Sequence, residues 1–137
     1  MQPAAEPTFV RNAASCDAPL DLGKDEGCPR RIFPLIHECG FDMGVETVPS
    51  QSRVPMHQHS DRDEVITILR GTAVVHVDGV ESTAVCGDMV LIRRGESHEI
   101  RNELADELFF SWAFTPSETS FSESMQLRAR QANEQDA

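Results

Sequence analysis

The stretch from His57 to Asn102 constrains this chain most, because it places three histidines and a glutamate at spacings that suit one metal site. His57 and His59 are two residues apart, and such residues project from the same face of a β-strand. Glu64 follows a polar, charged turn and begins an apolar, β-branched run that is typical of a strand. His98 comes 34 residues after Glu64. A closed antiparallel sheet would bring it back beside the other three.

This stretch resembles the two sequence motifs of the cupin family. The first motif is H-x-H, three or four residues, E, six residues and G, and its matches here are His57, His59, Glu64 and Gly71. The second is G, five residues, P-x-G, two residues, H, three residues and N, and its matches are Gly87, Gly95, His98 and Asn102. Two positions depart from the pattern. Arg93 occupies the proline position, and Gln51 stands six residues before His57, where the family usually has glycine.

The resemblance covers roughly residues 41–115 and implies an all-β fold, the double-stranded β-helix or jelly-roll barrel. We expect an extended N-terminal arm (1–30), a barrel (31–116), and a short C-terminal helix and tail (117–137). In such a barrel, the resemblance implies that His57, His59, Glu64 and His98 bind one ion. It also implies a homodimer, and we expect Asn102 to be structural.

The expected ligands, three neutral imidazoles and one carboxylate, form a mixed nitrogen and oxygen set without a thiolate. Such a set suits Fe, Mn, Ni, Cu, Zn or Co. We therefore expect one divalent transition metal ion, with iron as the first choice. Four protein ligands on a six-coordinate ion would leave two adjacent positions for a substrate, or for a substrate and dioxygen. The alternative is a barrel that keeps the motif without binding a metal.

Alternation of apolar and polar residues predicts further strands. Along 41–48 the alternation leads us to expect Phe41, Met43, Val45 and Thr47 on the inward face. Pro34 favours an edge position for a strand at 31–36, and Asp78-Gly79 predicts a two-residue hairpin. The strand at 107–114 carries one candidate core face, formed by Leu108, Phe110, Trp112 and Phe114. A capping box at 120–123 predicts the start of the C-terminal helix.

The net charge of −11 argues against nucleic acid or an anionic membrane as a partner. No apolar run approaches the length of a membrane span, and the N-terminus lacks the pattern of a secretory signal. We therefore expect a cytoplasmic location and reduced thiols. The chain has four cysteines, of which Cys86 is the best placed to line a pocket; the four are Cys16, Cys28, Cys39 and Cys86.

Several other polar residues are expected to lie outside the site. His37 is interpreted as a surface or core histidine, and His76 as a structural or outward-facing one. Surface charge is the preferred interpretation for five arginines, although any of them would suit an acidic substrate: Arg53, Arg62, Arg93, Arg94 and Arg101.

The chain contains no tyrosine, which excludes cupin chemistry that uses a tyrosine base or a cysteine–tyrosine crosslink. Three function classes stay open for a small-molecule substrate or ligand. The first is an Fe(II)-dependent dioxygenase, preferred by a narrow margin because small cupins often have that activity. The second is a non-redox lyase, isomerase or dehydratase, with a base supplied by Glu64 itself, by a hydroxide on the metal, or by a further His, Glu or Cys. The third is a non-catalytic binding module. Glu64 is the one candidate catalytic residue.

Overall fold

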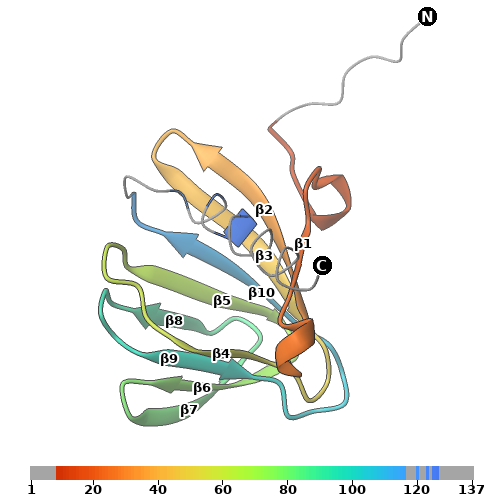
Figure 1. The fold of residues 1–137 in the computed structure, drawn as a ribbon, viewed down its shortest axis with the longest axis vertical. Helices are drawn as coiled ribbons and strands as arrows, with labels where there is room; N and C mark the ends of the chain where they lie inside the picture. The colour runs from red at the N-terminus through yellow and green to blue at the C-terminus, as the bar shows by residue number, and fades with distance from the viewer. Residues whose placement is uncertain (1–8, 117–119, 121–122, 124, 127–137) are drawn as a thin grey trace, which may run out of the picture.

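The computed structural model describes residues 9–116, 120, 123, 125 and 126, and two antiparallel sheets face each other in that part of the chain (Figure 1). The larger sheet has the strand order β1 (Leu20–Leu22), β2 (Arg30–Glu38), β3 (Phe41–Val48), β10 (Leu108–Phe114), β5 (Glu64–Arg70), β8 (Met89–Ile92). The smaller sheet has the order β4 (Arg53–His57), β9 (His98–Arg101), β6 (Thr72–Val77), β7 (Val80–Val85). This arrangement confirms the predicted all-β jelly-roll barrel.

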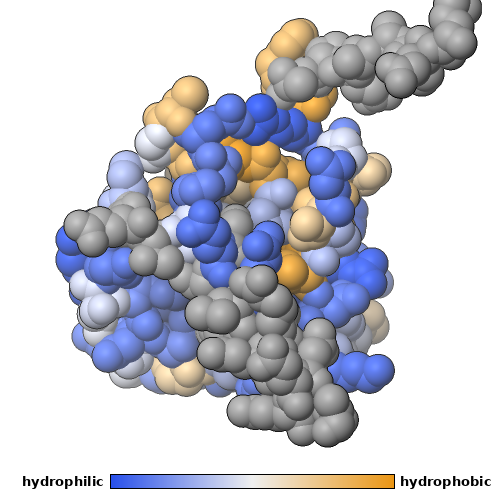
Figure 2. Space-filling view, turned by 45° about the horizontal axis from the view of Figure 1, so that its top comes forward, coloured by the Kyte–Doolittle hydropathy of each residue, from blue (hydrophilic) through white to orange (hydrophobic). Residues whose placement is uncertain are grey.

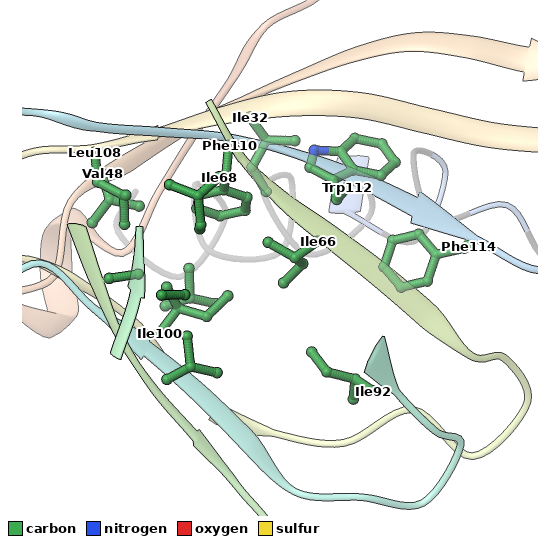
Figure 3. Packing of buried hydrophobic residues seen from close by; sticks show 14 of the residues in the cluster. Ile32, Val48, Ile66, Ile68, Ile92, Ile100, Leu108, Phe110, Trp112 and Phe114 are labelled. Carbon is green, nitrogen blue, oxygen red and sulfur yellow. The ribbon is translucent and has the colours of Figure 1, made fainter. Parts of the chain in front are cut away.

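The space between the two sheets is filled by apolar side chains from both (Figure 3). The predicted core face of β10 is confirmed, since Leu108, Phe110, Trp112 and Phe114 are all buried. Ile66 and Ile68 of β5 join them from the larger sheet, and Ile100 of β9 packs from the smaller one. The 78–79 hairpin is also confirmed: Asp78 and Gly79 both have positive φ and connect β6 to β7.

The expectation for the inward face of β3 is wrong. The buried residues of this strand are Asp42, Gly44, Glu46 and Val48, whereas Phe41, Met43, Val45 and Thr47 are exposed or half-buried. The register explains the reversal, because β10 pairs Phe110 with Glu46 and Phe114 with Asp42. Cross-strand partners share a face, so burying the aromatic face of β10 turns the two carboxylates of β3 inward.

Part of the expected N-terminal arm joins the larger sheet. β1 pairs with the start of β2, with Leu20 opposite Ile32, and Cys28 just before β2 is completely buried. β2 is therefore the edge strand only beyond residue 32. Pro34 lies in that unpaired part, next to a register shift between Pro34 and Ile36, so its missing N–H interrupts no central ladder.

The predicted C-terminal helix lies largely outside the described residues. Within them, the Ser120 hydroxyl accepts a hydrogen bond from the Glu123 backbone N–H at 2.9 Å, as an N-cap does. Met125 is buried in the core. In the described part of the chain, no helix has the length and apolarity that crossing a bilayer requires. Much of the face seen in Figure 2 is hydrophilic, with hydrophobic residues in separate patches.

Candidate metal centre

The structure brings together the three histidines that the sequence singles out. His57 is the last residue of β4 and pairs directly with His98, the first residue of β9. His59 follows β4 by two residues. One ring nitrogen from each of the three histidines lies within 4.8 Å of those of the other two. A single ion could therefore contact all three rings.

Glu64 approaches the histidines from the opposite sheet, because it is the first residue of β5. Its Oε1 atom lies 3.3 Å from Nε2 of His98 and 3.9 Å from Nε2 of His59. The side chain is 8% exposed. The four predicted ligands thus come from β4, the following turn, β5 and β9, and Glu64 lies beside two of the three clustered histidines.

Backbone carbonyls orient two of the imidazoles. Nδ1 of His57 lies 2.7 Å from the carbonyl oxygen of Pro55, and Nδ1 of His98 lies 3.0 Å from that of Glu96. A carbonyl only accepts hydrogen bonds, so each contact places a ring proton on Nδ1, and in the neutral ring the electron pair is then on Nε2. Metal-ligating histidines are usually held in this way.

Burial dominates the electrostatics of this cluster. Burial, with smaller contributions from His57, His98 and Arg62, lowers the pKa of His59 to about 3. Burial also raises the pKa of Glu64, against the opposing contact with His98. For His98, burial lowers the pKa, but the Glu64 carboxylate and the Glu96 carbonyl outweigh it and leave the pKa raised. His59 is therefore a neutral imidazole at physiological pH, the form that binds metals.

The residues present fit a transition metal ion. Oε1 of Glu64 and Nε2 of His98 are buried and make no well-aligned hydrogen bond in the described part of the chain. An ion placed among the three rings would satisfy both atoms. The donor set contains three nitrogens, one carboxylate and no thiolate, as expected for Fe, Mn, Ni, Cu, Zn or Co.

The cluster opens into a cavity of about 150 Å³ between the sheets. Its walls are largely core side chains, among them Ile66, Phe110 and Trp112. Besides the predicted ligands, three charged residues also line it: Glu26, Arg30 of β2 and Glu46 of β3. Neither Arg30 nor Glu46 was expected there from the sequence, because a charge in an alternating strand ordinarily indicates the solvent face. Burial raises the pKa of Glu46 to about 8; the Arg30 charge opposes this rise and the Glu64 charge adds to it.

The surface interpretation of Arg62 is wrong. Its side chain is only 6% exposed and contacts Asp61 at 3.0 Å and Asp42 at 3.8 Å. The guanidinium also lies 5.5 Å from the centre of the Phe114 ring, whose edge packs against His59. The inward-turned Asp42 explains this burial, because it gives the arginine a second carboxylate inside the barrel.

The remaining candidates lie away from the cluster. His37 is about half exposed and lies 4.0 Å from Asp42. His76 is opposite Glu99 and Glu81 in the smaller sheet. Cys86 is exposed and is not among the residues that line the cavity; its thiol contacts the Leu69 carbonyl at 3.3 Å.

The motif positions next to the ligands have structural roles. The Asn102 amide donates hydrogen bonds to the carbonyls of Val48 and Asp106, at 2.9 and 2.8 Å, and its oxygen accepts one from the Leu104 N–H at 3.1 Å. Arg93, in the proline position, donates its backbone N–H to Glu96 at 2.7 Å, a bond that proline could not make. Gln51, in the glycine position, adopts a left-handed backbone with φ of 65°.

Comparisons with known proteins place this geometry in a family. A family model described as a cupin domain matches residues 44–114. A Thermotoga maritima protein named oxalate-binding protein is 35% identical over 63 residues, which are 46% of this chain and 52% of that protein. The alignment therefore spans about half the length of this curated relative.

Solved structures show the same fold. A predicted oxalate decarboxylase from Thermotoga maritima matches with a TM-score of 0.71 and 23% identity, over 79% of this chain and 99% of that one. A sugar phosphate isomerase of the cupin superfamily from Silicibacter pomeroyi matches with a TM-score of 0.59 and 18% identity, over 64% of this chain and 60% of that one. At these identities the likeness shows the fold alone.

Proposed function

This chain belongs to the cupin family, and from that premise we propose that it is a metal-dependent enzyme acting on a small organic molecule. The observation that carries the proposal is a cluster of three imidazole rings, two of them beside one buried carboxylate, at the wall of a cavity. In the proposal, His57, His59, Glu64 and His98 hold one divalent ion. That ion would supply Lewis-acid polarisation of a substrate oxygen and, if it is iron, redox chemistry with dioxygen.

We propose a non-redox lyase or isomerase reaction as the first candidate. Such a reaction needs a group that moves protons, and the chain has no tyrosine. Glu46 meets this need, because it lines the cavity and its pKa of about 8 lets it hold or release a proton near neutral pH. The relatives named as a predicted oxalate decarboxylase and a sugar phosphate isomerase are consistent with this class.

The Fe(II)-dependent dioxygenase expected from the sequence is the second candidate. What favours it is the ligand set, because three imidazoles and one carboxylate suit iron as well as the other metals named above. In that reaction Glu46 would not be required as a proton donor or acceptor. The cytoplasmic location and the homodimer stay predictions.

Two measurements test the proposal. The first is the metal content of protein purified without oxygen, by mass spectrometry, where we expect close to one transition metal ion per chain. The second is turnover of a panel of small organic acids and sugars, measured with and without oxygen. Turnover under strict anaerobiosis supports the lyase or isomerase, and oxygen consumption that requires iron supports the dioxygenase. Protein that takes up no metal, or metal-loaded protein that binds ligands without forming product, contradicts the enzyme proposal.

A further inference from the structure

Arg30 and Glu46 lie side by side and are buried inside the cavity. Nε of Arg30 lies 3.3 Å from Oε2 of Glu46, and the two side chains are 8% and 6% exposed. Neither of these two atoms makes a well-aligned hydrogen bond to any other described residue. Buried polar atoms ordinarily have hydrogen-bond partners. Because Nε of Arg30 and Oε2 of Glu46 lack them, they can still bind a polar group that enters the cavity.

A glycine lies close to the Arg30 guanidinium. Gly23, between β1 and the short 3-10 helix Lys24–Glu26, has φ of 75°. A Cβ atom at this position would lie 2.0 Å from the Cys28 carbonyl oxygen and 2.9 Å from Nη1 of Arg30. The positive φ and the Cys28 carbonyl therefore require glycine at this position, and the Arg30 guanidinium packs close to it.

The pair and the metal ligands lie at different positions along the barrel. Glu46 is opposite Phe110 of β10, and Glu64 is opposite Phe114 of the same strand. Four residues separate these two pairing rows, which corresponds to about 13 Å of strand at about 3.3 Å per residue. Both groups nevertheless line the same cavity, because Arg30 and Glu46 are among its lining residues together with the four predicted metal ligands.

We propose that Arg30 and Glu46 form a second, anion-binding subsite of the cavity, where Arg30 binds a carboxylate of the substrate. The substrate class is a small organic acid whose carboxylate pairs with Arg30 while an oxygen at its other end reaches the metal ligands. This inference rests on the proposed function, because it assigns the second end of the same substrate. Guanidinium groups suit carboxylates because they present two parallel donors.

The charge state of Glu46 supports this assignment. Because burial raises its pKa to about 8, Glu46 is mostly protonated at pH 7 and leaves the Arg30 charge unneutralised. A substrate carboxylate then supplies the missing negative charge, and protonated Glu46 beside it can donate a hydrogen bond. Above pH 8 the ionised Glu46 competes with the substrate for Arg30.

The test is calorimetric titration of manganese-loaded protein at pH 7 with unbranched dicarboxylates, from oxalate to adipate. We expect the affinity to reach its optimum at an acid longer than oxalate, because oxalate cannot reach both ends of the cavity. Arg30→Gln should weaken binding of the optimal acid at least tenfold and change oxalate binding less than threefold. Arg31→Gln is the matched control, since Arg31 is the next residue of β2, is exposed and pairs with Asp21.

A second variant keeps the test decisive if Arg30→Gln does not fold. Glu46→Gln removes the competing charge, so the affinity of this variant for the optimal acid should be the same at pH 9 as at pH 7. The affinity of the wild type for that acid should fall at least threefold from pH 7 to pH 9. The other ionisable side chains that line the cavity stay in place in this variant: Glu26, Arg30, Glu64, His57, His59 and His98.

Two results would overturn the subsite: a folded Arg30→Gln protein with wild-type affinity across the series, or an identical pH response of wild type and Glu46→Gln. Failure of the metal-dependent enzyme proposal can be distinguished from failure of the subsite. If the protein takes up no manganese, butyrate and benzoate are titrated into metal-free protein. Binding of these acids that requires Arg30 still supports the subsite, and binding that does not require it overturns the subsite.

Discussion

His57 and His98 are direct cross-strand partners, although they are 41 residues apart in the sequence. Their ring centroids lie 4.1 Å apart, and each ring is held through Nδ1 by a carbonyl two residues before it. The pairing of β4 with β9 therefore fixes two ligands at once. The geometry of the metal centre depends on this pairing as much as on the ligands themselves.

Replacing His57 with alanine should abolish stoichiometric metal binding, because the three remaining ligands would hold an ion more weakly. Mass spectrometry of the purified variant measures this directly. His37→Ala is the control, since His37 is about half exposed and lies outside the cluster. Full metal content in the His57→Ala protein would refute the assignment.

Replacing Asn102 with alanine should lower the free energy of unfolding by about 2–4 kcal/mol, because two carbonyls and one N–H lose their partner in a buried position. Metal content should stay at the wild-type level in the folded variant. Urea unfolding and mass spectrometry check the two statements separately. Loss of metal from a folded Asn102→Ala protein would contradict the structural role.

Glu46 should make the protein less stable as the pH rises. The folded state keeps a proton on Glu46 up to about pH 8, whereas the unfolded chain releases it near 4.5. Between these values the folded state binds more protons, so stability falls with pH, by up to about 1.4 kcal/mol per pH unit for this group. The Glu46→Gln variant has no carboxyl at this position and therefore lacks this pH-dependent change in stability.

Urea unfolding of both proteins at pH 5.5, 6.5 and 7.5, in the same metal state, measures the effect. The stability of wild type relative to Glu46→Gln should decline steadily over this range. Glu107→Gln, at an exposed position before β10, is the control and should parallel wild type. A constant difference between wild type and Glu46→Gln would show that Glu46 does not titrate there.

Gln51 should be replaceable by glycine but not by valine. Its left-handed backbone, with φ of 65°, costs L-residues about 1–2 kcal/mol and is worst for β-branched side chains. We expect Gln51→Gly to be more stable than Gln51→Val by about that amount, measured by urea unfolding. The glycine variant loses the Gln51 hydrogen bond to the Glu103 carbonyl, so its gain in stability over wild type should be smaller than its gain over Gln51→Val. Equal stability of the two variants would contradict the strain.

We expect a homodimer in solution. The outer face of β5 and β8 exposes apolar side chains that are neighbours in the register: Val65 opposite Leu91, and Met89 two residues along β8. Burying them against a second copy would remove this apolar area from water. Light scattering should report twice the chain mass for wild type. A Met89→Asp, Leu91→Asp double variant should be monomeric, with Val80→Asp as an exposed control. A monomeric wild type would refute this prediction.

The sequence by itself determined the identity of the candidate metal ligands and the type of fold. The spacing of His57 and His59, the β-branched run after Glu64 and the Asp78-Gly79 turn are local signals, because each depends on one strand or one turn. Motif matching extended them to His98, and the structure places the three histidines together, with Glu64 beside His59 and His98.

Only the tertiary structure decided which face of each strand is inside. An alternating strand has two faces, and its own sequence favours the apolar one for the core. In β3 that preference fails, because pairing with β10 matches Glu46 to Phe110 and Asp42 to Phe114. Burying the aromatic face of β10 removes its apolar side chains from water, and the register with β10 then turns two carboxylates of β3 inward. The burial of Arg62 and the Arg30–Glu46 pair follow from that long-range pairing, which no local pattern records.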